Sequence, residues 1–197
     1  MNIWKHFCTI TRHKLLVMKG CFQVGLYKQG LLHDMSKYSL TEFPMGCKYY
    51  QGNMSPNNAE RNDKGYSSAW LHHKGRNKHH FEYWIDYAAG GGEKFLCGMK
   101  MPIRYVVEMF IDRVCASKNY QKEKYADTSA YLYYNRNKDQ ILMHDDTRAL
   151  LEYLMFYLIA KGEKETFSYI KHEVLKGKVP YNKAELDELK DALHVPM

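Results

Sequence analysis

Histidine and aspartate stand together in this chain at positions that could bind a metal ion. His33-Asp34 is the clearest pair; His13 precedes it, Asp112 follows it, and the 197 residues contain ten histidines in all. A helical protein holds a divalent metal with neutral imidazoles and anionic carboxylates that converge from several elements. The spacing of these residues therefore predicts a site that is assembled by tertiary structure.

His13 is expected to face the interior. It lies on one helical stripe with Ile10 and Val17, at spacings of three and four residues. A buried imidazole is costly unless it is hydrogen-bonded or bound to a metal. A hydrogen-bonded core histidine is the alternative, but the other histidines and the His-Asp pair favour a ligand.

Two further histidine pairs, His72-His73 and His79-His80, follow in the sequence. On a continuous helix, His73 and His80 would share one face, and His72 and His79 would share another. Gly75 interrupts that helix, so the pattern does not choose a ligand within either pair. A solvated basic face is the alternative, because three cations alternate with these histidines. The three cations are Lys74, Arg76 and Lys78.

The order of these residues resembles that of a known superfamily. His13, His33-Asp34 and Asp112 match the H…HD…D pattern of the HD-domain superfamily of metal-dependent phosphohydrolases. Residues 33–37 are similar to its HD-x-G/S-K run, and residues 112–116 are similar to its D-x-x-x-A helix. Residues 79–82 resemble the HH-x-E run of the branch that hydrolyses cyclic dinucleotides. That branch also carries a Gly-Tyr-Pro signature, which is missing here, so cyclic di-GMP specificity is not implied.

The resemblance implies a centre with one or two divalent metal ions. His13, His33, Asp34 and Asp112 would hold one ion, and Asp34 would bridge to a second. Two of the four later histidines would complete the second site. On an ideal helix Asp112 points away from the apolar stripe of its own helix. Its weaker substitutes are Glu82, Asp86 and Glu108. The sequence does not distinguish Mn²⁺, Fe²⁺, Mg²⁺ and Zn²⁺.

Phosphate recognition is expected from cations beside these ligands. Lys37 lies within one helical turn of the His-Asp pair, while Lys74, Arg76 and Lys78 flank the later histidines. Arginine offers bidentate contacts to phosphate, and lysine acts as a point charge. These four residues are therefore the predicted substrate-binding cations.

Hydrolysis of a small phosphorylated or nucleotide-like substrate is the predicted function. Metals would activate water for attack on phosphorus, and Asp34 or Glu82 would accept the proton of that water. Two alternatives remain. The same donors serve a di-iron oxygenase in some HD-fold proteins, and a basic nucleic-acid-binding protein without turnover would show steep salt dependence and no need for metal.

The chain also resembles a closer family of bacterial and bacteriophage proteins, known only as a domain of unknown function. The likeness covers about residues 1–175 and is carried by segments 30–43, 48–84 and 101–113. It implies no established activity. Members of this family are sometimes called catalases, but nothing in this sequence identifies a haem pocket, and a dimanganese bundle would need more carboxylates.

The apolar pattern is helical almost throughout, and period-two alternation is nearly absent. We predict an all-α fold: an HD-domain-like helical bundle that forms a single domain over residues 1–197, with the helices of 145–197 packed on the core. Residues 44–66 are predicted to be mainly loop, with a short helix behind Ser55. The other predicted helices span 3–28 with a possible joint near Gly20, 31–39, 67–88 with an interruption at Gly75, 102–117, about 128–136, 146–160, 163–176, and 183–193 behind an Asn182 cap.

Composition and charge indicate which partners and which cellular compartment to expect. A net charge of +7 favours polyanionic partners such as phosphates, nucleotides or nucleic acid. No stretch approaches the about 18 apolar residues of a membrane span, and the first residues lack the apolar core of a secretory signal. Five cysteines without a C-x-x-C spacing argue against disulfides and thiolate zinc sites, and favour buried thiols in a cytoplasmic protein.

Overall fold

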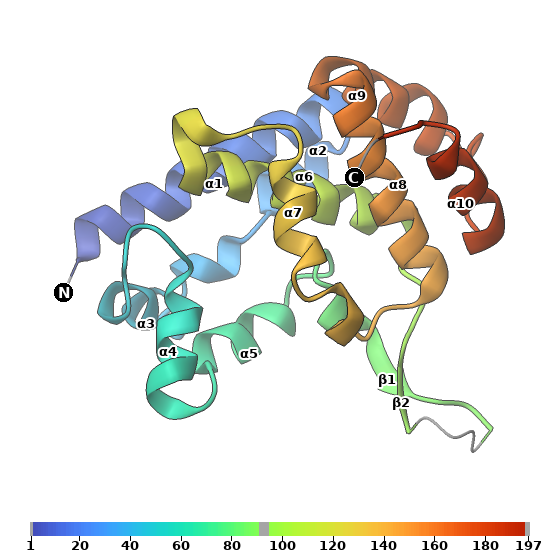
Figure 1. The fold of residues 1–197 in the computed structure, drawn as a ribbon. Helices are drawn as coiled ribbons and strands as arrows, with labels where there is room; N and C mark the ends of the chain where they lie inside the picture. The colour runs from blue at the N-terminus through green and yellow to red at the C-terminus, as the bar shows by residue number, and fades with distance from the viewer. Residues whose placement is uncertain (1, 91–94, 196–197) are drawn as a thin grey trace.

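The computed structural model describes residues 2–90 and 95–195, and its regular secondary structure is helical apart from one small hairpin (Figure 1). The all-α prediction is confirmed. The α-helices are α1 (Ile3–Val24), α2 (Tyr27–Leu32), α3 (Phe43–Lys48), α4 (Pro56–Lys64), α5 (Ser68–Lys74), α6 (Ile103–Gln121), α7 (Ser129–Asn135), α8 (Asp145–Lys161), α9 (Glu163–Tyr169) and α10 (Lys183–Asp191). Strands β1 (Ile85–Tyr87) and β2 (Leu96–Gly98) pair antiparallel, with Asp86 opposite Cys97.

The hydrophobic core lies where α1, α6 and α8 meet. Val17, Phe110 and Leu154 are fully buried there, one from each helix. Helix α8 is apolar around most of its circumference, so it needs cover on several sides. It contacts α6, α7, α9 and α10, and Figure 1 shows it running between α7 and α10. No helix in the described part of the chain combines the length and the apolar character needed to cross a bilayer.

Helix α1 carries the predicted buried stripe, but it ends later than the predicted joint. His6, Ile10, His13 and Val17 are all buried on one face. The helix passes through Gly20 and ends at Val24, where Gly25 caps it with a left-handed φ of 89°. Gly20 instead permits close packing, because a Cβ there would lie 2.8 Å from Ile111 Cγ2 of α6.

Two predicted helices are shorter than predicted: the first breaks at His33, and the second stops at the predicted interruption, Gly75, without resuming as an α-helix. The segment 31–39 leaves α2 after Leu32 and resumes as a 3-10 turn over Met35–Tyr38. The segment 67–88 is helical only in α5; a turn, a 3-10 segment at Phe81–Trp84 and strand β1 follow. The hairpin was not predicted, because three-residue strands are too short to show alternation.

The two predicted caps are confirmed, whereas the prediction of a loop over residues 44–66 is wrong in part. Ser55 accepts from Asn57 N at the start of α4, and Asn182 accepts from Glu185 N at the start of α10, as predicted. Within 44–66, however, α3 occupies Phe43–Lys48, with Pro44 in its first turn, a position where proline is tolerated. The predicted helix 163–176 is α9 followed by a π-helical turn at Ile170–Val174. Cys21, Cys47 and Cys115 are buried as predicted, whereas Cys8 is exposed.

Candidate metal centre

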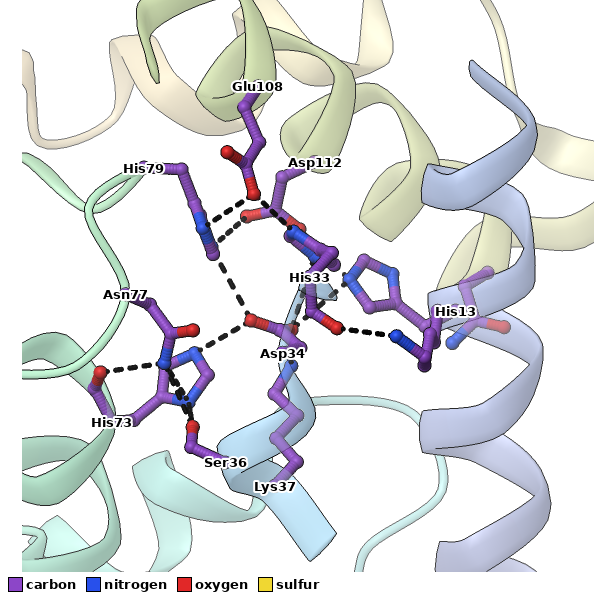
Figure 2. A network of polar contacts seen from close by, with 12 residues as sticks. His13, His33, Asp34, Ser36, Lys37, His73, Asn77, His79, Glu108 and Asp112 are labelled. Carbon is purple, nitrogen blue, oxygen red and sulfur yellow. Dashed lines mark hydrogen bonds and ion pairs between the residues drawn. The ribbon is translucent and has the colours of Figure 1, made fainter. Parts of the chain in front are cut away.

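Five separate segments bring histidines and carboxylates to one buried place (Figure 2). His13 comes from α1, and His33 and Asp34 come from the break after α2. His73 belongs to α5, His79 and His80 follow in the next turn, and Glu108 and Asp112 lie one helical turn apart on α6.

The break after α2 explains how adjacent residues both reach the centre. On a helix, neighbouring side chains point about 100° apart. Here His33 is extended, with ψ 126°, and Asp34 has a left-handed φ of 55°. Aspartate tolerates this conformation better than most residues do. Both side chains consequently turn inward, and the two residues are 1% and 2% exposed.

One group, which we call site A, consists of His13, His33, Asp34 and Asp112. His13 Nε2 lies 2.9 Å from Asp112 Oδ1 and 3.7 Å from Asp34 Oδ2. His33 Nε2 lies 3.3 Å from Asp34 Oδ2 and 3.6 Å from Asp112 Oδ1. Asp112 therefore turns toward the histidines, although its place on the helix wheel had set it apart from the apolar stripe.

A second group, site B, consists of Asp34, His73, His79 and His80. His73 Nε2 and His79 Nε2 lie 3.1 and 3.4 Å from Asp34 Oδ1. The ring of His80 is 4.2 Å from that of His79 and 4.8 Å from that of His73, measured between centroids. The structure thus selects His73 from the first pair and brings in both members of the second.

Asp34 is the residue that the two groups share. Its Oδ1 faces the imidazoles of site B, whereas its Oδ2 faces those of site A. Burial opposes ionisation of this carboxyl, but His33, Lys37 and His73 around it hold its pKa well below the usual range. Asp34 is therefore an ionised carboxylate with one oxygen directed at each group.

The donor atoms fit metal ions because several of them have no other partner. Asp34 Oδ1 and the Nε2 atoms of His33, His73, His79 and His80 are buried without a hydrogen bond in the described structure. Leaving a buried polar atom unsatisfied costs about 1–3 kcal/mol. Within each group, one donor atom per residue lies within 4.8 Å of all the others. Imidazole and carboxylate donors so arranged could hold one divalent ion at each site.

Two glutamates stand behind the imidazoles. Glu108 Oε1 lies 3.0 Å from His33 Nδ1 and 3.1 Å from His79 Nδ1. Glu42 Oε2 lies 2.8 Å from His73 Nδ1. Carboxylates that accept from one ring nitrogen fix the tautomer and direct the other nitrogen toward a metal. Each of these three imidazoles therefore presents Nε2 to Asp34.

The carboxylates also shift the imidazoles electrostatically. Burial alone would lower the pKa of His33, but Asp34, Asp112 and Glu108 together raise it well above its ordinary value. The pKa of His79 is raised as well, against burial and the charge of His33, by the same carboxylates Asp34 and Glu108. Metal binding at such rings must displace protons.

The remaining predicted residues lie in different surroundings. Lys37 Nζ is 2.6 Å from Asp34 Oδ2, with 30% of its side chain exposed. His72 belongs to neither group; its Nδ1 lies 2.6 Å from Glu42 Oε1. Glu82 has a buried Oε2 without a hydrogen bond in the described structure, and burial raises the pKa of this carboxyl.

The three other predicted cations form no ion pair with a residue of site A or site B in the described structure. Lys74 is half-buried, whereas Arg76 and Lys78 are exposed. Arg76 Nη1 lies 3.4 Å from the carbonyl oxygen of His72, and Lys78 Nζ lies 5.6 Å from the centre of the Tyr83 ring. Among the described residues, Lys37 is the lysine that forms an ion pair with the centre.

Glu42 was not singled out in the sequence, and Glu108 was only an alternative to Asp112. Glu108 carries a usable signal, because it precedes Asp112 by four residues on one helix and so shares its face. Glu42 carries none, because only the packing of α3 against the α4–α5 segment brings it to His73.

Comparison with known proteins supplies a family. Residues 2–156 match DUF5662, described as a family of unknown function. The chain belongs to this family. No curated protein and no solved structure matches it.

The matched range covers the whole candidate metal centre. It contains every residue of sites A and B, together with Glu42 and Glu108, and it ends inside α8. The DUF5662 description states no activity.

Proposed function

We propose that this DUF5662 protein is a metal-dependent phosphohydrolase or phosphodiesterase that acts on a nucleotide-like phosphoester at a dinuclear His/Asp centre. The observation that carries the proposal is Asp34, whose two oxygens face two separate groups of buried imidazoles. A carboxylate in that position is suited to bridge two cations. The order of the motifs, which resembles the HD-domain superfamily, supports the same interpretation.

Sites A and B would each hold one divalent ion. When bound, such ions lower the pKa of a coordinated water towards about 7 and neutralise charge on a phosphoryl group. The chain itself supplies the arrangement. Asp34 ties the two sites together, and Glu108 orients one imidazole of each, His33 and His79.

Lys37 is the proposed phosphate-binding cation. Its ammonium group lies beside site A, and 30% of the side chain is exposed to solvent. An incoming phosphate oxygen could therefore replace Asp34 as its partner without burying an unpaired charge. Lys74, Arg76 and Lys78 would act farther out, by attracting an anionic substrate through long-range charge.

Glu82 is the proposed proton carrier. Asp34 is engaged on both sides, so it is poorly placed to exchange protons. Glu82 lies two residues after His80, is half-buried and has an Oε2 atom without a hydrogen bond in the described structure. Because burial raises its pKa, it is a stronger base than an exposed glutamate.

The test combines metal analysis with a panel of phosphoesters. The purified protein is stripped with a chelator, reloaded with Mn²⁺, Fe²⁺, Mg²⁺ or Zn²⁺, and assayed against phosphomonoesters, phosphodiesters and nucleotides. Asp34→Asn should abolish both metal retention and hydrolysis, whereas the exposed Asp86→Asn should leave both intact. Full activity in Asp34→Asn, or metal binding with no hydrolysis of any ester, would refute the proposal.

A di-iron oxygenase is the second candidate. The observation in its favour is the imidazole-rich donor set of site B, because imidazole suits iron. An oxygenase would consume O₂ and develop visible absorption when loaded with Fe²⁺ in air. A hydrolase would release phosphate or alcohol from an ester without consuming O₂.

A further inference from the structure

The two sites differ in how well their donor atoms are satisfied without metal. At site B, Asp34 Oδ1 and the Nε2 atoms of His73, His79 and His80 are all buried without a hydrogen bond in the described structure, and His73 and His79 approach Asp34 Oδ1 only to 3.1 and 3.4 Å. At site A, only His33 Nε2 is buried without a hydrogen bond in the described structure. Because a buried polar atom without a hydrogen bond is unfavourable, site B gains more from a bound ion than site A does. An ion bound at site B would satisfy more of these buried donor atoms than an ion bound at site A.

Site A, in contrast, contains shorter contacts between its donors and other charged groups. His13 Nε2 lies 2.9 Å from Asp112 Oδ1, and Lys37 Nζ lies 2.6 Å from Asp34 Oδ2. The ammonium group therefore neutralises the oxygen that would bind the ion of site A. A cation entering site A must displace Lys37 from that oxygen, whereas no lysine contacts Asp34 Oδ1 in the described structure.

The donor types differ as well. Site B offers three imidazoles and one carboxylate, whereas site A offers two imidazoles and two carboxylates. Imidazole donors suit Zn²⁺ and Fe²⁺, and carboxylate oxygens suit Mn²⁺ and Mg²⁺. The two positions are thus chemically suited to different ions.

We infer that the centre fills in order: site B binds the first and tighter ion, of a kind that prefers imidazole, such as Zn²⁺ or Fe²⁺, and site A binds a second, exchangeable ion in competition with Lys37. The inference rests on the metal centre of the proposed function. It adds that the ion of site A is the one coupled to substrate.

That coupling follows from the place of Lys37. When an ion at site A displaces Lys37 from Asp34 Oδ2, the ammonium of this side chain, which is 30% exposed as a whole, becomes available to an anion. An anion that binds Lys37 in turn removes the competitor of the ion. By linkage, phosphate and the ion of site A must strengthen each other's binding by the same factor.

The experiment measures metal binding to the full chain, with the metal and inorganic phosphate as the only added ligands. The protein is stripped with a chelator and titrated with Zn²⁺ or Mn²⁺, with elemental analysis of the stoichiometry. We expect two steps separated by at least about tenfold in affinity, with inorganic phosphate tightening only the weaker step. Asp112→Asn should remove the weaker step, and His80→Gln should weaken the tighter step.

Lys37→Gln provides the decisive variant, because it removes the competing charge and leaves every metal donor in place. We expect it to tighten the weaker step by about tenfold or more and to abolish the effect of phosphate. The exposed Lys28→Gln is its matched control and should change neither step. Circular dichroism confirms that each variant is folded before titration.

Three results would overturn the inference: equal affinities in the wild-type chain, loss of the tighter step in Asp112→Asn, or an unchanged weaker step in Lys37→Gln. Failure of the proposed function has a different signature. If the two metal-binding steps occur in the expected order but no phosphoester is hydrolysed, ordered metal binding is supported and the proposed hydrolase function is refuted. If hydrolysis requires metal but the ions bind equally, the function stands and the inference falls.

Discussion

Glu108 gives the sharpest test of the geometry, because a single carboxylate oxygen contacts one imidazole of each site. Its Oε1 lies 3.0 Å from His33 Nδ1 and 3.1 Å from His79 Nδ1, and the residue is 4% exposed. Loss of a carboxylate behind a metal-binding imidazole typically costs about 10–100-fold in metal affinity, or about 1.4–2.8 kcal/mol.

Glu108→Gln keeps a carbonyl acceptor and removes the charge, so we expect a loss of about tenfold, at the lower end of that range. Glu108→Ala removes both and should lose about 100-fold. Because His33 belongs to site A and His79 to site B, both binding steps should weaken together. Among the residues of the two sites, Glu42 contacts His73 alone, so Glu42→Gln should weaken only the step of site B.

The assay is a competition titration of each variant with Zn²⁺ against a chromophoric chelator. The exposed Glu123→Gln serves as the control for the loss of one negative charge and should bind as the wild type does. Unchanged affinity in Glu108→Gln, or weakening confined to one step, would refute the claim that Glu108 orients an imidazole of each site.

Three further predictions concern stability. A saturating divalent ion should raise the melting temperature and a chelator should reverse this, since an ion at 100 times its Kd adds about 2.7 kcal/mol; an unshifted melting curve would contradict the fit of the centre. Gly46→Ala should lower the free energy of unfolding by about 1–3 kcal/mol in urea titrations, because the new methyl group would overlap the buried His6 ring. Burial opposes ionisation of Glu60, but hydrogen bonds from Ser67 and Ser68 lower its pKa to about 2. Its contribution, at most about 3 kcal/mol, is therefore present above pH 4.5 and lost as the pH falls through 2, and Glu60→Gln should remove this dependence.

Local patterns in the sequence predicted most of the long helices and two of their caps. The stripe of α1 placed His13 inside, and the side chains of Ser55 and Asn182 begin α4 and α10 as predicted. These features depend on neighbours within one or two turns, so the order of residues along the chain is sufficient to reveal them. The gathering of His13, His33, Asp34 and Asp112 was likewise expected, although there it was a family resemblance that supplied the set.

Tertiary structure alone decided which donors face one another. His72 and His73 are equivalent in the sequence, yet α5 turns His73 toward Asp34 and leaves His72 beside Glu42. The left-handed turn at Asp34 is likewise invisible to helical periodicity, which continued a helix through it. The physical reason is that orientation toward a shared point depends on the packing of five distant segments, and that packing is set by contacts between residues far apart in the chain.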